Sequence, residues 1–320
     1  MILSLALIPV VALLVVIYMK DKNEKEPIGF LAVLFLAGMG TIIPAIIAEL
    51  IGELVIELVI PGESVIKAYI IAVMLVGPVE ELGKYVVLRL MTWNSKHYNY
   101  SYDAIVYAVF VSLGFAAFEN VGYVIQHGFA TAILRMFTAV PGHACFAVFM
   151  GYYYSKAKYA QITNNRQDHN KYTVISLVVP ILIHGIYDAI AMGAGAAESL
   201  LFGGLSIICW FGFVLLMFAA SCYVVIQAAK NDFCFMPVQS NGQGSGWVYY
   251  RPAVIGSWNC SCGKVNQLNF CTECGSPRPM VNYWTCPQCG TPCTFNFCGN
   301  CGYPAGGQNM QAGGQNMPVG

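Results

Sequence analysis

Long apolar runs occupy most of the first 230 residues and limit what this chain can fold into. Seven of them reach about 20 residues, the length that an α-helix needs to cross a bilayer. Hydrophobic residues make up 57% of the 320-residue chain and charged residues only 10%, whereas about a quarter of a typical soluble domain is charged. We therefore predict an all-α polytopic membrane protein with about seven transmembrane helices. The runs lie near 1–19, 28–51, 66–90, 103–126, 130–154, 173–196 and 200–229.

The charges between the runs predict how the chain crosses the membrane. Lys and Arg favour the cytoplasmic side, and they gather after the first, third, fifth and seventh runs, whereas Glu prevails in the other loops. The first run lacks the basic start and the cleavage site of a signal peptide. The acidic segment 52–64 is too short for a span and is expected to extend the second helix or to lie at the interface. We expect a multi-pass protein of the inner or plasma membrane, with its N-terminus outside and its C-terminus in the cytoplasm.

Cysteine pairs in the last third of the chain predict two small zinc-ribbon modules. Each set begins with a Trp and holds two cysteine pairs, which suits tetrahedral zinc, and a reducing cytoplasm disfavours disulfides. We expect a transmembrane domain over 1–230, a flexible linker over 231–256, ribbons over 257–279 and 280–304, and a disordered tail over 305–320. The predicted Zn²⁺ ligands are Cys260, Cys262, Cys271 and Cys274 in the first ribbon and Cys286, Cys289, Cys298 and Cys301 in the second.

The ribbons are predicted to be structural. Four thiolates leave no open coordination position for water, which argues against catalysis there. A role in binding a cytoplasmic protein partner is more consistent with this ligand set. The formal net charge of zero gives no indication of nucleic-acid binding.

Ionisable residues interrupt several of the apolar runs. A charge at hydrocarbon depth costs several kcal/mol, so such residues usually line a cavity that needs them. In EELGK, Glu80 and Lys84 are spaced to share a helix face, and His184 and Asp188 have the same spacing, so that the carboxylate can orient the imidazole. Their depths in the runs predict a single central site, for a reaction or for transport. The candidate residues are Glu80, Glu81, Lys84, Glu119, His143, His184 and Asp188.

Several protease motifs are absent from the sequence. It contains no HExxH zinc motif, no GxSxG serine motif and no GxGD-type aspartate motif. Cys145 lies two residues from His143, so the two side chains would point to different sides of a helix. A Cys–His pair is therefore not favoured.

Four motifs together resemble the PrsW family of intramembrane proteases. They are EELGK, FAAFEN, the mid-membrane His143 and HGIYD, and the resemblance covers roughly residues 25–230. The family is distantly related to the CAAX prenyl endopeptidase and bacteriocin-processing group. Membership implies cleavage of membrane-embedded protein substrates, such as the anti-sigma factor that the best-known member cuts. The ribbons lie outside the family core.

The resemblance also suggests roles for the candidate residues. Similarity to the CAAX group implies Glu80 as the general base on water, with Glu81 or Lys84 orienting and neutralising it. His184 would polarise the carbonyl or donate a proton, with Asp188 holding its ring.

The chain departs from the related group in its second motif. That motif ends in His in the CAAX group, whereas Glu119 stands here, and Glu119 can be an acid, a ligand or a structural partner of Lys84. Alternatively, Glu80, Glu119, His143 and His184 would bind a catalytic zinc ion, since two His and a carboxylate form a common catalytic set.

Two other classes of protein remain as alternatives. An ion-coupled transporter would use the same Glu and His residues as a proton relay, but such proteins typically contain inverted repeats, and none is visible here. A membrane receptor or scaffold acting through its ribbons would leave the intramembrane charges unexplained. An intramembrane peptidase is the preferred hypothesis.

Overall fold

The computed structural model describes residues 2–238 continuously and only short stretches beyond them. These are 246–250, 258–259, 262–263, 265–266, 284–285 and 292–293. The chain divides into two compact units, Met1–Ala253 and Val254–Gly320.

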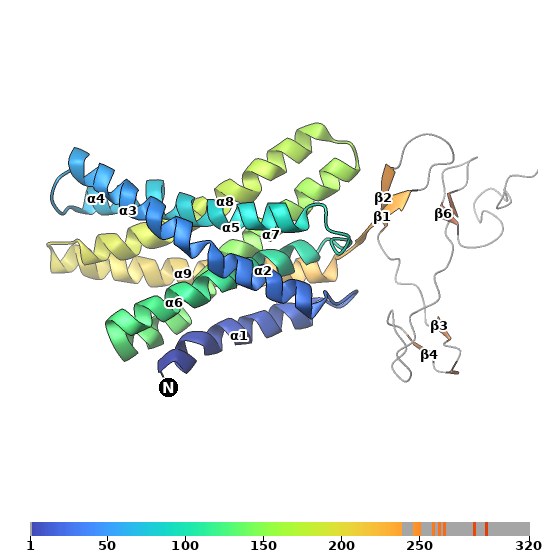
Figure 1. The fold of residues 1–320 in the computed structure, drawn as a ribbon, viewed down its shortest axis with the longest axis horizontal. Helices are drawn as coiled ribbons and strands as arrows, with labels where there is room; N and C mark the ends of the chain where they lie inside the picture. The colour runs from blue at the N-terminus through green and yellow to red at the C-terminus, as the bar shows by residue number, and fades with distance from the viewer. Residues whose placement is uncertain are drawn as a thin grey trace, which may run out of the picture. The chain divides into compact units, whose positions relative to one another are not determined.

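The described part of the first unit is a bundle of helices followed by a β-hairpin (Figure 1). The hairpin pairs β1 (Cys234–Val238) with the antiparallel strand β2 (Gly246–Tyr250), within the segment expected to be a linker. The helical elements are α1 (Ile2–Lys20), α2 (Ile28–Gly40), α3 (Ile42–Val59), α4 (Val65–Ile71), the π-helix η1 (Ala72–Val76), α5 (Gly77–Thr92), α6 (Asp103–Phe137), α7 (Ala139–Ile162), α8 (Arg166–Gly195) and α9 (Leu200–Lys230).

Several helical stretches are long and apolar enough to cross a membrane. By length and composition, four qualify among the described residues: Ile28–Val59, Asp103–Ile162, Arg166–Gly195 and Leu200–Lys230. The shorter stretch Ala6–Lys20 is also apolar. The predicted helical membrane fold is therefore confirmed, and the expected number of seven spans stays a prediction.

The structure settles one helix end that the sequence left open and moves another. The acidic segment after residue 51 continues α3 to Val59, which is one of the two arrangements expected for it. The break expected near 127–130 is a kink at Gly128, whose φ of 78° is accessible to a residue without a Cβ. The helix resumes after the kink, so α7 begins at Ala139 rather than near 130.

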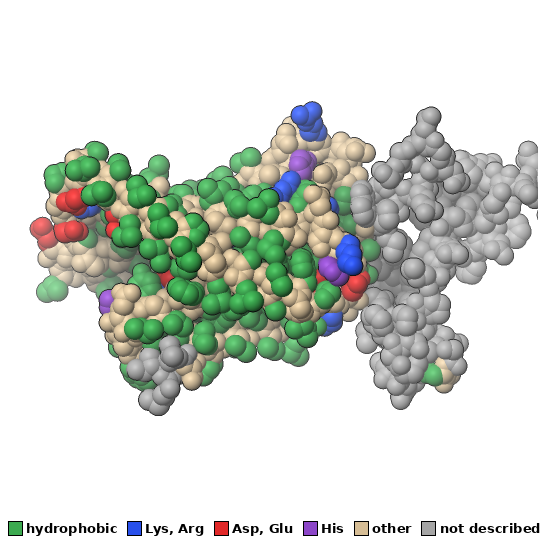
Figure 2. Space-filling view, viewed as in Figure 1, with side chains coloured by type: hydrophobic (Ala, Val, Ile, Leu, Met, Phe, Trp, Pro, Cys, Tyr) green, Lys and Arg blue, Asp and Glu red, His purple; other side chains and the backbone are tan. Residues whose placement is uncertain are grey.

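The surface of the bundle is apolar along its length. Figure 2 shows acidic side chains gathered at the α3–α4 end and most Lys and Arg side chains at the end from which β1 emerges. This distribution suits a bundle whose sides face lipid and whose ends face water. The exposed large apolar side chains include Leu36, Leu50, Leu58, Leu90, Ile125, Leu182 and Leu215.

The centre of the bundle is α6, which contacts α1, α2 and α7. From Asp103 to Ala117 every residue of α6 is buried except the half-buried Phe110. Glycines let α2 approach it closely, because a Cβ at Gly38 or at Gly114 would overlap a backbone carbonyl oxygen of the other helix.

The end of the bundle beneath β1 is held by backbone hydrogen bonds. Phe235 donates its backbone N–H to the Asn99 carbonyl at 2.6 Å, and Ser101 donates to the Phe233 carbonyl at 2.9 Å. The Asp232 carboxylate accepts a hydrogen bond from the Tyr102 N–H at 2.8 Å. The chain after α9 is therefore fixed against the loop between α5 and α6.

Two carboxyl groups between α1 and α2 are buried at this same end. Asp21 and Glu26 are 1% and 3% exposed, and within the described part of the chain neither carboxyl oxygen of Asp21 has a hydrogen-bond partner. Burial raises the pKa of Asp21 to about 7 against the opposing effect of Lys25, and nearby Asp232 adds to the rise. Burial also raises the pKa of Glu26 to about 7.

The second unit is described in four two-residue strands and in residues 262–263. β3 (Trp258–Asn259) pairs antiparallel with β4 (Val265–Asn266), and β5 (Trp284–Thr285) with β6 (Pro292–Cys293). In sequence, each hairpin encloses the first cysteine pair of one predicted zinc set. Cys262 is exposed in the β3–β4 turn, and the other seven predicted ligands lie outside the described residues. The zinc ribbons and the 305–320 tail therefore stay predictions.

Replacing Asp21 by Asn is expected to stabilise the protein in a pH-dependent way. The folded-state pKa of Asp21 is about 7 against an ordinary 3.8, so folding retains a proton that the unfolded chain releases, and wild-type stability falls as the pH rises through this window. Asn cannot lose a proton. The gain in Tm in detergent should therefore grow from about pH 4 to pH 7 and then level off. Glu198→Gln, at an exposed position, is the control; a gain that does not change with pH would contradict this.

Candidate active site

The seven ionisable residues predicted from the apolar runs come together inside the bundle. They reach one another from four helices that are distant in sequence. Three lie in the first half of α5, two in α8 and one each in α6 and α7. In that order they are Glu80, Glu81, Lys84, His184, Asp188, Glu119 and His143.

The ammonium group of Lys84 lies at the centre of the cluster. Its Nζ donates to Glu81 Oε1 at 2.7 Å, to Glu80 Oε2 at 3.0 Å and to His143 Nδ1 at 3.2 Å. It also lies 4.1 Å from the centroid of the Phe115 ring. The Lys84 side chain is 1% exposed, so its charge is compensated almost entirely by these groups.

His184 lies between carboxylates on both sides of its ring. Its Nδ1 is 3.0 Å from Glu81 Oε1, and its Nε2 is 3.1 Å from Asp188 Oδ2. The ring of Phe146 stacks on the imidazole with centroids 4.5 Å apart. These contacts hold the ring on both edges and on one face.

His143 is oriented by a second carboxylate. Because the ammonium of Lys84 donates to Nδ1, the hydrogen of the neutral ring lies on Nε2 and is donated to Glu119 Oε2 at 2.9 Å. Glu119 in turn accepts from Arg135 Nη2 at 2.7 Å. One of the roles left open for Glu119 was that of a structural partner of Lys84. In the structure its cationic partner is Arg135 instead. Asn120 joins this network by accepting from Arg135 Nε at 2.9 Å.

Close helix contacts explain why α5 and α8 bring their residues together. A Cβ at Gly77 would lie 3.0 Å from the backbone nitrogen of Gly185, and one at Gly185 would lie 3.0 Å from the Cα of Val73. Gly185 follows His184 directly, so the close approach places that imidazole beside the first turn of α5. The π-helix η1 immediately precedes Gly77, and such segments are frequent near functional sites.

The cluster contains a set of donors that suits a metal ion. One donor atom from each of Glu80, Glu81, His143 and His184 lies within 4.8 Å of the others. Nδ1 of His184 faces Glu81 and Nδ1 of His143 faces Lys84, whereas Nε2 of each ring faces a carboxylate, Asp188 or Glu119. Metal-binding histidines are commonly oriented in this way by a carboxylate on the second nitrogen. The donor set therefore fits a metal, with Glu81 in the place that the sequence proposed for Glu119.

Two ionisable residues of the site were not singled out from the sequence. Arg135 lies beyond the Gly128 kink and pairs with Glu119. Glu49 of α3 interacts electrostatically with Glu80, Glu119 and His184. The same signal, an ionisable residue within an apolar stretch, marks both of them.

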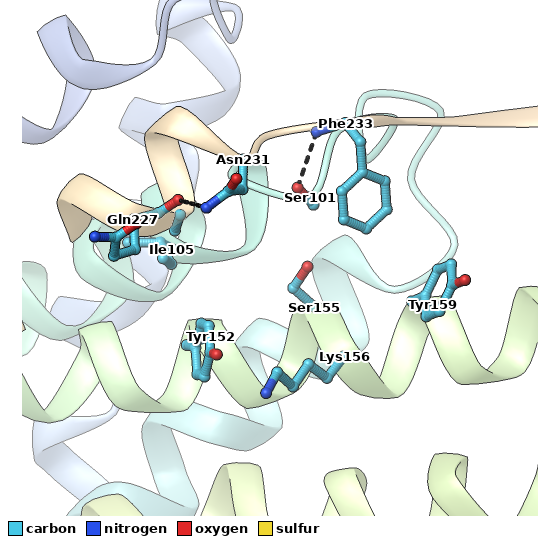
Figure 3. Close-up of a pocket in the computed structure, with 10 residues that line it drawn as sticks. Ser101, Ile105, Tyr152, Ser155, Lys156, Tyr159, Gln227, Asn231 and Phe233 are labelled. Atoms are coloured by element: carbon cyan, nitrogen blue, oxygen red, sulfur yellow. Dashed lines mark hydrogen bonds between the residues drawn. The ribbon is translucent and has the colours of Figure 1, made fainter. Parts of the chain in front are cut away.

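A cavity of about 400 Å³ lies elsewhere, between α6, α7 and the end of α9. Figure 3 shows Tyr152, Ser155 and Lys156 of α7 along one side of it and Gln227 and Asn231 along the other. None of its lining residues belongs to the carboxylate–histidine cluster. The cluster itself is closed, because Glu80, Glu81 and His184 are at most 5% exposed.

The site lies within a region that matches a known family. The family model described as PrsW family intramembrane metalloprotease matches residues 26–221. No solved structure matches the chain.

Curated relatives match a stretch of similar length. Protease PrsW of Geobacillus kaustophilus is 34% identical over 186 residues, which are 58% of this chain and 77% of that protein. Protease PrsW of Bacillus subtilis is 33% identical over 189 residues, 59% of this chain and 82% of that protein. Protease PrsW of Clostridioides difficile is 33% identical over 192 residues, 59% of this chain and 78% of that protein. The resemblance seen in the four motifs is thus confirmed, and the chain belongs to the PrsW family of intramembrane metalloproteases.

Proposed function

We propose that this intramembrane protease hydrolyses a peptide bond of a membrane-anchored protein at the cluster of Glu80, Glu81, His143 and His184. The observation that carries the proposal is the convergence of two carboxylates and two imidazoles around one lysine inside an apolar bundle. Groups of this kind are costly at hydrocarbon depth unless a reaction or a transport path needs them. Membership of a protease family favours the reaction.

The two adjacent glutamates take different roles in this proposal. Glu80 Oε2 accepts a hydrogen bond from Lys84, and the rest of the carboxylate is left to activate water. Glu81 is 0% exposed, and its Oε1 faces both Lys84 and His184. Glu80 is therefore assigned as the general base, and Glu81 as the residue that holds Lys84 and His184 in position.

Hydrolysis then proceeds through groups that the cluster supplies. Glu80 takes a proton from water, and the water oxygen attacks the carbonyl carbon of the scissile bond. Lys84 offers positive charge to the oxygen that becomes negative. The proton on Glu80 passes to the departing nitrogen as the C–N bond breaks, which yields an amine and a carboxylic acid that then releases its own proton. Asp188 and Glu119 orient His184 and His143 through their Nε2 atoms.

A metal ion is consistent with the charge of the cluster. Four carboxylates, Glu80, Glu81, Glu119 and Asp188, face two permanent cations, Lys84 and Arg135. Protons or a divalent ion must supply the remaining positive charge. Glu80, Glu81, His143 and His184 would hold such an ion, which when bound polarises a carbonyl or acidifies water.

We propose that the end bearing most of the Lys and Arg faces the cytoplasm, with the N-terminus outside. The distribution of charge in Figure 2 supports this orientation. The zinc ribbons would then lie in the cytoplasm, where they bind a protein partner. Protease added to sealed right-side-out vesicles should leave the cysteine-rich unit intact and should degrade it in inverted vesicles. Degradation in right-side-out vesicles would reverse the assignment.

Replacing Glu80 by Gln is expected to abolish cleavage without unfolding the protein. Gln keeps the size of the side chain but cannot take a proton, and losing a general base costs about 10²- to 10⁴-fold in rate. Cleavage is measured on a pool of single-span membrane proteins in liposomes. Glu63→Gln is the control, because the Glu63 side chain is 94% exposed in the α3–α4 turn. Cleavage by the Glu80 variant at the wild-type rate would remove Glu80 from the mechanism.

Removing the metal is expected to abolish cleavage, and zinc is expected to restore it. The full-length protein is treated with 1,10-phenanthroline and assayed on the same substrates before and after addition of Zn²⁺. Bound metal is counted in parallel by mass spectrometry. His184→Ala should carry one metal ion fewer per chain than wild type, whereas His127→Ala, at an exposed position of α6, should carry the wild-type number. Equal metal content in all three proteins would exclude a metal at the cluster.

A further inference from the structure

Glu49 lies on the face of α3 that turns toward the active site. Ala45, Glu49 and Gly52 follow one another at intervals of four and three residues, which places them on one helix face. Ala45 is buried, and a Cβ at Gly52 would overlap the side chain of Leu75 in η1. Glu49 is therefore directed toward the bundle rather than toward lipid.

The Glu49 carboxyl differs from the other carboxyls of the site in its pairing. Glu80 and Glu81 contact Lys84, Glu119 contacts Arg135, and Asp188 contacts His184. Glu49 Oε1 is buried, and among the described residues it has no hydrogen-bond partner. It nevertheless interacts electrostatically with Glu80, Glu119 and His184. A buried acceptor without a donor costs about 1–3 kcal/mol, so the site is one hydrogen-bond donor short on this side.

The second half of α3 is only loosely covered by the rest of the bundle. Ala45 is the last buried residue of α3, and the rest of the helix to Val59 has none. The outward positions of this half carry apolar side chains such as Leu50 and Leu54, both exposed. A transmembrane segment of a substrate lying against α3 would therefore meet apolar side chains first and the Glu49 carboxyl behind them.

The charge of the site indicates which donor is missing. Glu80 and Glu119 act on the Glu49 carboxylate with like charge, and His184 is the group that opposes them. A cation placed beside Glu49 would therefore be favoured over a neutral donor.

We propose that Glu49 is a substrate-binding residue that pairs with a lysine or arginine side chain next to the scissile bond. This inference rests on the proposed function, since it names a specificity determinant of the same site. A cationic side chain supplies both the missing donor and a charge opposite to that of the carboxylate. Such a side chain can extend along the substrate helix toward a carboxylate at this depth, because its aliphatic stem is compatible with lipid.

The test compares substrates that differ by one charge. The full-length protein in liposomes is given a single-span substrate in which Lys, Arg or Gln is placed at each position around the cut site in turn. We expect wild type to cleave the Lys and Arg forms at one position with a kcat/KM at least tenfold above that of the Gln form. Glu49→Gln should lose this preference, so that its kcat/KM is the same for the Lys, Arg and Gln forms. Glu49→Asp should keep part of the preference, and Glu53→Gln, at an exposed position one turn away, should keep all of it.

Other outcomes would overturn the inference. Wild type that shows no preference for a basic residue at any position would exclude it. A Glu49→Gln variant with an unchanged Tm that slows cleavage of every substrate equally would assign Glu49 to the reaction itself. If wild type and Glu80→Gln are equally unable to cleave any substrate, the proposed function fails, and this result is distinct from a loss of preference.

Discussion

The lysine ammonium between two glutamates is the interaction on which the rest of this structure depends. In α5, Lys84 is held by Glu80 and Glu81 of its own helix and contacts His143 of α7. From these groups the contacts continue to His184 of α8 and to Glu119 of α6. Removing one partner of a buried pair leaves an uncompensated charge and typically costs about 3–5 kcal/mol. The contacts that assemble the site are therefore also contacts that hold four helices together.

Close packing of the backbones makes this network geometrically possible. Side chains of ordinary length can meet within hydrogen-bond distance only where the helices that carry them are near each other. The contact between Gly77 and Gly185 brings α5 to α8, next to the residues that bear the charges. At Gly128 the chain leaves helical geometry. The kink allows Arg135, which follows it, to pair with Glu119, which precedes it. Positions without a Cβ thus determine which charges can pair.

The family match and the site cover the same part of the chain. Residues 26–221 match the family model, and this range contains every member of the cluster as well as Glu49 and Arg135. The cysteine-rich unit after residue 253 lies beyond it. The predicted zinc ribbons are therefore an addition to the region shared with the family.

The sequence by itself determined the helical membrane fold and the residues of the cluster, because apolar length and charges within apolar runs are local properties. It also determined the contacts of Glu80 with Lys84 and of His184 with Asp188, since helix geometry places residues four apart on one face. Only the tertiary structure decided the partner of Glu119 and the position of Glu49. It also decided that Glu81, and not Glu119, belongs to the set of possible metal donors. Those features depend on which helices approach one another and on the kink at Gly128, and neither is encoded in the periodicity of a single helix.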